Sequence, residues 1–375
     1  MTSEWNHFAL GEITELVIDY RGKTPKKLGG DWCKQGYRAL SAKNIKTGRI
    51  VQAETIRYID ESLYRKWMKD EVQRGDILIT SEAPFGQIFF WDSDEKIVLS
   101  QRLFCVRIKP EYDARFIYYY MTTPEFQSEL DGRATGTTVI GLRQPELMKC
   151  VIRCPEIQEQ KVIAAILSSI DAKIIANEKV NDNLQQQAQA IYSSMFIDNP
   201  DPAWSHGHLS DLITVKYGKD HKKLADGIYP VYGSGGIMRY VERPLYNKES
   251  VLIPRKGTLN NVMYVNQPFW SVDTMFYTEM KLPNVAKFVY HFVKAKDLVS
   301  MNAGSAVPSM TTDILNAMEV VIPSASALEE FESLVAPMYE AMEANDVQSK
   351  ALSQMRDTLL PKLMSGEIDV SAVQL

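Results

Sequence analysis

The chain has 375 residues, of which 45% are hydrophobic and 24% charged, and its formal net charge at pH 7 is −5. This length favours at least two domains, and the composition is that of a globular rather than a disordered protein. The acidic balance argues against a uniformly cationic DNA-coating protein, and the lack of a signal-peptide pattern or a long apolar run leads us to expect a cytoplasmic protein.

The first half opens with short β-rich runs separated by Gly, Pro and Asn turns. These runs are LGEITELVIDYRGKTPKK, GYRALSAKNI, GDILITSEAPFGQIFFW and LSQRLFCVRI, and FIYYYMTTPEFQ follows them with the pattern of a short helix. The three consecutive tyrosines of that last run, Tyr118 to Tyr120, are expected in a core rather than on a stacking surface. The pattern predicts a compact α+β domain over residues 1–154.

A long amphipathic helix is predicted next, over residues 155–197, and its first half lies in the stretch CPEIQEQKVIAAILSSIDAKI from Cys154 to Ile174. The segment DNPDPAW at 198–204 contains two prolines, which end a helix, so it is predicted to be a linker. A second α+β domain is predicted over 205–322, and a second long helix with a C-terminal tail over 323–366 and on to 375. Pro155 and Pro323 mark the starts of the two helices, and Pro200 and Pro202 in the linker mark where the first helix has ended.

The two halves form an internal repeat. GTTVIGLRQPELMKCVIRCPEIQEQ begins at Gly136 and GSAVPSMTTDILNAMEVVIPSASALEEF begins at Gly304, which is 168 positions later. Leu147 and Leu315 share this offset, as do Pro155 and Pro323. The repeat predicts two domains of one architecture, related by a pseudo-twofold axis.

The helices that follow keep the same offset, and their apolar stripes alternate steps of four and three residues, which is the period of a coiled coil. The positions expected to pair are Ile163, Leu167, Ile170, Ile174, Asn177 and Leu184 with Phe331, Val335, Met338, Met342, Asn345 and Leu352. A pseudo-twofold axis favours antiparallel pairing, although periodicity alone also allows each helix to pack on its own domain. A mid-stripe Asn in each helix would fix the register.

Basic residues cluster in corresponding loops of the two domains. Residues 21–49 contain nine Lys or Arg residues against one acid, and VKYGKDHKK at 215–223 repeats the feature. Solvated lysines and phosphate contact both explain such a cluster, but its recurrence favours phosphate contact. The residues expected to contact phosphates are Arg21, Lys23, Lys26, Lys27 and Lys43 in the first domain and Lys216, Lys219, Lys222 and Lys223 in the second.

Base edges are read best by groups that make paired hydrogen bonds, namely Arg with guanine and Asn or Gln with adenine. For a chain that reads DNA sequence, as the family resemblance given below implies, the candidate base readers by that rule are Asn44, Gln101, Arg102, Arg133 and Arg143 in the first domain and Arg255, Asn260, Asn261 and Asn302 in the second. The alternative for each of these residues is that it is an ordinary surface side chain or an amide that caps a turn.

No motif of an enzyme active site is evident, and the four cysteines match neither zinc-knuckle spacing nor a secreted disulfide framework. We therefore expect no catalytic residue and no metal site in this chain. The cysteines are expected to be reduced packing residues.

Together these features resemble the specificity (S) subunits of type I restriction-modification systems. The resemblance covers essentially the whole chain and rests on the doubled plan of domain and helix, the turns SEAPFGQIFF and PRKGTLNNVMYV, the segment VYGSGGI, and the helix entry with its C-terminal echo LLPKLMSGEI. No one of these motifs is decisive. Their order and duplication make the resemblance specific.

The resemblance implies a non-catalytic DNA-reading protein in which each target-recognition domain reads one half of a bipartite, asymmetric site. It implies that the two helices form an antiparallel coiled coil that sets the unread spacer and docks two methyltransferase (M) subunits. S-adenosylmethionine is then expected on the M subunits, with restriction (R) subunits joining the complex, and no cofactor on this chain. The alternative is a coiled-coil scaffold that does not read DNA sequence.

Overall fold

The computed structural model describes residues 5–136, 140–301, 309–371 and 373. The chain divides into two compact units, of which the first is assembled from two segments and the second is one continuous segment between them. Unit 1 comprises Met1–Ile175 with Gln348–Leu375, and unit 2 comprises Ala176–Val347. Each long helix therefore contributes to both units.

Unit 1 is built around an antiparallel four-stranded sheet in the order β2-β10-β7-β8. Its strands are β2 (Thr14–Asp19), β10 (Leu103–Ile108), β7 (Ile77–Thr80) and β8 (Ile88–Phe90). All four residues of β7 and five of the six in β10 are buried, as expected for central strands covered on both faces. The sheet is therefore the rigid centre of the unit.

Smaller sheets surround this centre. They are β6 (Arg57–Ile59), β3 (Tyr37–Leu40) and β9 (Ile97–Leu99), the hairpin β4 (Ile45–Lys46) and β5 (Arg49–Ile50), and the pair β1 (Asn6–Ala9) and β11 (Val151–Cys154). The short helices are α1 (Leu10–Ile13), α2 (Glu61–Trp67), α3 (Ala114–Met121), α4 (Pro124–Arg133) and α5 (Gln144–Leu147), with single 3-10 turns at Lys26–Leu28, Ala42–Asn44 and Ala53–Thr55.

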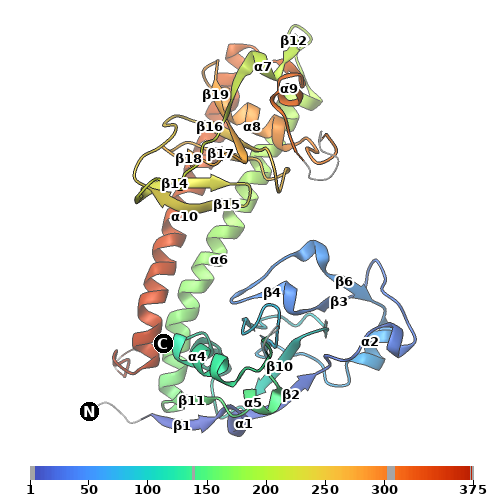
Figure 1. Ribbon diagram of the computed structural model, residues 1–375, viewed down its shortest axis with the longest axis vertical. Helices are drawn as coiled ribbons and strands as arrows, with labels where there is room; N and C mark the ends of the chain where they lie inside the picture. The colour runs from blue at the N-terminus through green and yellow to red at the C-terminus, as the bar shows by residue number, and fades with distance from the viewer. Residues whose placement is uncertain (1–4, 137–139, 302–308, 372, 374–375) are drawn as a thin grey trace. The chain divides into compact units, whose positions relative to one another are not determined.

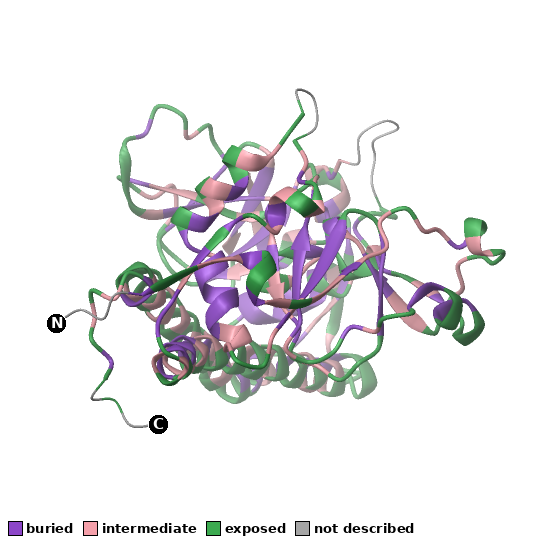
Figure 2. Cartoon of the chain, turned by 90° about the horizontal axis from the view of Figure 1, so that it is seen from below, coloured by how far each residue is buried: buried purple, intermediate pink, exposed green. Residues whose placement is uncertain are grey.

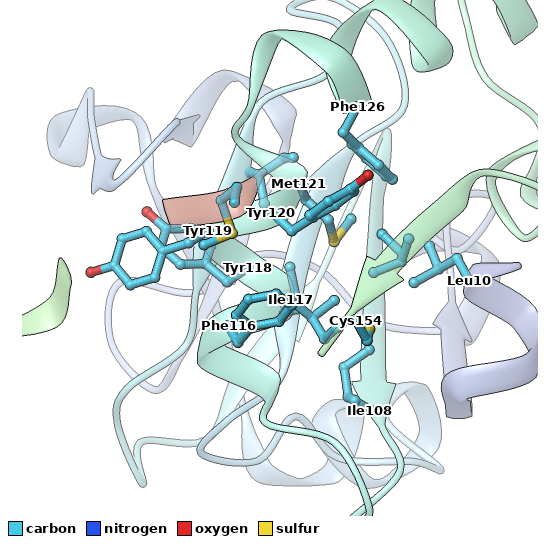
Figure 3. Close-up of a cluster of buried hydrophobic side chains, with 14 of the residues drawn as sticks. Leu10, Ile108, Phe116, Ile117, Tyr118, Tyr119, Tyr120, Met121, Phe126 and Cys154 are labelled. Carbon is cyan, nitrogen blue, oxygen red and sulfur yellow. The ribbon is translucent and has the colours of Figure 1, made fainter. Parts of the chain in front are cut away.

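Helix α3 supplies much of the core of unit 1. Asp113 caps its N-terminus by accepting a hydrogen bond from the Phe116 amide, which satisfies a backbone donor that the helix leaves unpaired. Phe116 to Met121 are all buried, and their side chains gather with Leu10, Ile108, Phe126 and Cys154 in the cluster of Figure 3. The tyrosine run is thus core, as predicted.

Unit 2 repeats this plan. Its central sheet has the order β13-β19-β16-β17, and a second sheet has the order β15-β14-β18. These strands are β13 (Ile213–Tyr217), β19 (Met275–Met280), β16 (Ser250–Pro254), β17 (Met263–Val265), β15 (Gly236–Val241), β14 (Asp226–Gly233) and β18 (Trp270–Ser271). The pair β12 (Ser205–His208) and β20 (Glu319–Ile322) and the helices α7 (Leu209–Leu212), α8 (Ala286–Lys294) and α9 (Thr312–Asn316) complete the unit.

The predicted repeat is confirmed in the two main sheets and in the strand and long helix that follow them. Each unit has a four-stranded antiparallel sheet of the same order and a second sheet with one parallel pair, β3 with β9 in unit 1 and β14 with β18 in unit 2. The strand before each long helix and that helix itself begin at corresponding positions, Val151 and Glu319 for the strands and Ile157 and Ala325 for the helices. The α+β architecture is therefore duplicated.

The long helices are α6 (Ile157–Ser193), which ends in a π-helical turn at Ser194–Asp198, and α10 (Ala325–Met364). Within unit 1, Ile163 and Leu167 of α6 share a buried cluster with Leu363 and Met364 of α10. Each helix is buried along one side and exposed along the other (Figure 2). In unit 1 the start of α6 therefore lies beside the end of α10 (Figure 1).

Asparagines connect the same helices within unit 2. Asn177 Nδ2 donates to the Asn345 carbonyl at 3.4 Å, and Asn181 Nδ2 donates to the Met342 carbonyl at 3.2 Å. Asn345 Nδ2 donates to Asn181 Oδ1 at 2.8 Å. Partners that move backward on α10 as α6 moves forward define antiparallel pairing, so the predicted direction is confirmed.

The positions expected to pair differ in burial. Ile163, Leu167, Ile170, Ile174, Asn177, Phe331 and Val335 are buried, and Leu184, Met338, Met342, Asn345 and Leu352 are half-buried. Some also serve their own unit, because Phe331 packs edge-on against Tyr192 and His291 in the core of unit 2. The stripes therefore pack both on the other helix and on the globular domain.

Arg356, which interrupts the stripe of α10, pairs with Asp171 of α6 at 2.8 Å, both within unit 1. A guanidinium on the apolar side of a helix needs such a partner because an unpaired buried charge is costly. This ion pair connects the helices where the apolar stripe is broken.

His291 makes unit 2 sensitive to acid. It is fully buried, with Nδ1 2.8 Å from Gln189 Oε1 and Nε2 2.9 Å from the Tyr339 hydroxyl, and burial lowers its pKa to about 4. The ordinary value is about 6.5, so between these pH values the unfolded chain binds more protons. Stability should therefore be unaffected above pH 6.5 and fall by up to roughly 3 kcal/mol as the pH drops toward 4.

Histidine-selective NMR tests this directly: the His291 ring should stay neutral at pH 5.5, and a His291→Gln variant identifies its resonance. A His291 ring that titrates near pH 6.5 in the folded protein would contradict this account.

Candidate nucleic-acid interface

Three loops of unit 1 meet at one edge of its central sheet. The strands are antiparallel, so the segments after β2 and β7 and the segment before β10 emerge at the same end, with Asp19 opposite Phe104 and Thr80 opposite Leu103. The Ser81 amide donates to the Arg102 carbonyl at 2.9 Å, which joins two of these loops. The loops enclose a cleft of roughly 530 Å³ whose lining includes Asp19, Arg21, Lys23, Glu82, Gln101 and Arg102. Four of the predicted DNA-contacting residues therefore share one site.

Arg21 is held by several contacts at this edge. Its Nε and Nη2 each donate to Asp19 at 2.8 Å, and the guanidinium lies over the Phe104 ring at 4.0 Å. This paired geometry fixes the side chain on the sheet and neutralises much of its charge. Arg21 therefore orders the loop of the cleft in addition to any phosphate contact.

The lysines predicted to contact phosphates in unit 1 differ in whether their amino groups already bond to the protein. Lys23 donates from Nζ to the Trp67 carbonyl at 2.6 Å and lies 3.8 Å from the centre of the Tyr20 ring, and partial burial lowers its pKa. Lys27 Nζ donates to the Gly22 carbonyl at 2.9 Å. Lys26 and Lys43 are exposed. Lys26 and Lys43 are therefore the lysines placed to meet a phosphate without losing an internal contact.

The candidate base readers of unit 1 fall into two groups, three at the cleft or its edge and two elsewhere. Gln101, Arg102 and Arg143 are exposed. Arg143 immediately precedes α5, and the neighbouring Leu142 amide donates to the Ser81 carbonyl at 3.0 Å, which brings this segment to the edge of the cleft.

Asn44 and Arg133 lie elsewhere. Asn44 is buried, its Oδ1 accepts from the Ser41 amide at 3.1 Å, and its Nδ2 donates to Thr55 Oγ1 at 3.0 Å, so this amide joins the segments on either side of the β4–β5 hairpin. Arg133 bonds Glu129 one turn earlier on α4 and is absent from the lining of the cleft. We leave both out of the proposed interface.

Unit 2 has an equivalent edge. Gly218 follows β13 and is closely covered, since a Cβ there would lie 2.0 Å from the Val272 carbonyl oxygen. The Arg255 amide donates to the Thr274 carbonyl at 2.9 Å, and Arg255 Nη1 donates to the Asp273 carbonyl at 3.3 Å. The guanidinium lies 5.4 Å from the centre of the Tyr217 ring. Arg255 thus sits at the edge of the sheet.

The other predicted residues of unit 2 are distributed around this edge. Lys219, Lys222 and Lys223 are exposed, whereas Lys216 lies 3.6 Å from Glu279 on the sheet. Asn261 Nδ2 donates to the Ser234 carbonyl at 2.8 Å, and Asn260 Nδ2 donates to Asp297 at 3.2 Å, so both amides are used to order loops. Asn302 lies outside the described residues.

Two residues at the edges were not among those predicted from the sequence to contact DNA. Glu82 forms an ion pair with Arg102, and a β-bridge joins it to Gly141, whereas Lys256 is bridged in the same way to Ser309. Gly141 and Ser309 occupy corresponding positions of the repeat, so Glu82 and Lys256 do as well. Aligning the two halves at this turn, SEAPFG (81–86) against RKGTLN (255–260), was the available signal.

Within the described ranges, no group of three or more His, Cys, Asp or Glu side chains is arranged to hold a metal ion. Cys105, Cys150 and Cys154 are buried and Cys33 is half-buried, and all four are free thiols. Among the helices of the described chain, none is long and apolar enough to cross a membrane.

Comparison with known proteins gives a consistent result. The family model of the type I restriction modification DNA specificity domain matches residues 2–186 and 203–331. The type I restriction enzyme MjaIX specificity subunit of Methanocaldococcus jannaschii is 25% identical over 341 residues, covering 79% of this chain and 78% of that protein. The HindI specificity subunit of Haemophilus influenzae is 20% identical, covering 80% and 88%.

A solved structure shares the fold. The crystal structure of a type I restriction-modification S subunit from M. genitalium aligns over 96% of each chain with a TM-score of 0.60 at 18% identity. Since the family model matches two segments that together cover most of the sequence, this chain belongs to the family of the type I restriction modification DNA specificity domain.

Proposed function

We propose that this chain is the DNA sequence-recognition subunit of a type I restriction-modification complex. Each unit uses the edge of its central sheet to read one half of a bipartite, asymmetric DNA site. The chain performs no chemistry itself, and the M subunits that it docks bind S-adenosylmethionine and methylate the DNA. R subunits join the same complex to cleave unmethylated sites.

One observation carries the proposal. The two units form the same sheet edge through corresponding backbone contacts, but they present different side chains there. The backbone contacts correspond, with the Ser81 amide bonded to the Arg102 carbonyl in unit 1 and the Arg255 amide bonded to the Thr274 carbonyl in unit 2. The side chains do not correspond: Glu82 in unit 1 is matched by Lys256 in unit 2. Because base readout depends on the donors and acceptors presented to the groove, two such edges suit two different half-sites.

The paired helices support the spacer and docking roles. A rigid helix pair holds two readers at a defined separation, which a flexible linker does not do. Val180, Leu334 and Val347 on the unit 2 portions of the helices, and Met355 on the unit 1 portion, are exposed apolar side chains. A partner that covers exposed apolar side chains removes them from water, and the M subunits are the partners we assign to them.

A coiled-coil scaffold that ignores DNA sequence is the alternative, and a selection experiment separates the two. The chain in complex with its M subunit is incubated with a random DNA pool at moderate salt, where sequence-independent phosphate attraction fades. We expect the bound fraction to be enriched in a bipartite motif with two dissimilar halves. Binding of all sequences equally would contradict the proposal and favour the scaffold.

Lysines at the edge of unit 2 should contribute affinity without sequence preference. Replacing Lys222 and Lys223 by Ala should weaken binding to all DNA and lower the slope of log affinity against log salt by about 2, one per lost phosphate contact. The matched control is Lys248→Ala with Lys281→Ala, because these exposed lysines lie at the opposite edge of the same sheet, before β16 and after β19. An altered preferred sequence, or an equal loss in the control, would contradict the phosphate role.

A further inference from the structure

Glu82 and Arg102 face each other across the cleft of unit 1. Glu82 follows β7 and Arg102 precedes β10, and Glu82 Oε1 lies 3.0 Å from Arg102 Nε. Their side chains are 35% and 48% exposed, so both remain open to an incoming ligand. The contact uses Nε, which leaves the two terminal nitrogens of the guanidinium to meet other acceptors.

The backbone beneath this pair is fixed. The Ser81 amide bonds the Arg102 carbonyl, and the β-bridge to Gly141 holds Glu82 from the other side. Arg102 itself has a φ of 62°, a left-handed conformation that residues other than glycine seldom adopt and that is retained mainly where it serves a function. The two side chains are thus presented from defined positions, as base reading requires.

The other cations of the cleft are less suited to reading bases. Arg21 is held by both oxygens of Asp19, and Lys23 donates to the Trp67 carbonyl. The Arg102 pair is exposed, and an exposed ion pair contributes little to stability, so DNA can replace it at low cost. Arg102 is therefore the guanidinium of this cleft that is best placed to read a base.

The chemistry of the pair matches one base pair. Arginine makes its characteristic double contact with guanine O6 and N7, and a carboxylate accepts from the N4 amino group of cytosine. Guanine and cytosine lie opposite each other in the major groove, so adjacent Arg and Glu side chains complement a single G·C pair. We propose that Glu82 and Arg102 together read one G·C base pair in the half-site of unit 1, an inference that rests on the proposed function.

Unit 2 cannot read DNA in this way. Lys256 stands at the position of Glu82, and Thr274 stands at that of Arg102. Neither a carboxylate nor a guanidinium is present at these positions, so the second half-site depends on other groups. Changes to Glu82 or Arg102 must therefore alter one half-site and leave the other intact.

The test compares the DNA motifs selected from a random pool by complexes of the M subunit with the wild-type chain, Glu82→Gln or Arg102→Gln. In each variant we expect one G·C position of the same half-site to lose about 5-fold to 150-fold of its preference, which corresponds to one lost base contact. Glu125→Gln is the matched control, since Glu125 is an exposed carboxylate of unit 1 paired with Arg153 at 2.7 Å. The control should select the wild-type motif.

Each other outcome has a defined meaning. A wild-type chain that selects no motif overturns the proposed function, and this inference with it. If the wild type selects a bipartite motif but both variants keep its G·C preference, only the inference fails. Loss of preference in only one of the two variants also overturns joint reading, because only one of the two side chains then determines the preference at that position. Thermal melts of the complexes confirm that the variants are folded.

Discussion

The C-terminal end of α10 packs into the core of unit 1, and the remaining architecture depends on this contact. Leu363, Met364 and Val370 are buried in the cluster that also contains Ile163 and Leu167. Unit 1 is therefore completed by the end of α10 and by Val370, which follows it. Helix α10 must run back along α6 to deliver them, so the antiparallel helix pair is required by the core of a recognition domain.

Duplication explains how one architecture can read two sequences. The buried strands and the backbone contacts between loops are the same in both units, and they determine where the edge residues stand. Glu82 is half-buried and Lys256 is exposed, so the core of the unit does not determine which side chain stands at this position. Stability and specificity are in this way assigned to different residues, which lets a half-site change without repacking a core.

Local signals predicted the repeat, the long helices and their pairing, because the 168-residue offset and the 3.5-residue stripe are properties of the sequence itself. The place of Leu363 and Val370 in unit 1 could not be predicted, since it arises from a contact between the ends of the chain. The role of Asn44 could not be predicted either. An amide in a basic loop suggests base reading, and its hydrogen bonds to Ser41 and Thr55 form only in the folded loop. Glu82 was missed because the rule for base readers considered only Arg, Asn and Gln and left out carboxylates, which accept from the amino group of cytosine.

The helix pair as a ruler between two readers is the central claim, and the length of the unread spacer measures it most directly. Residues 172–178 and 345–351, one heptad from each helix, are removed together, and the methylated motif is determined by sequencing DNA from cells that express the variant with its M subunit. Loss of seven residues shortens a helix by about 10 Å, or about 3 base pairs of DNA. The account predicts the same two half-sites with a spacer shorter by about that amount, whereas an unchanged spacer in an assembled, methylating complex would contradict it.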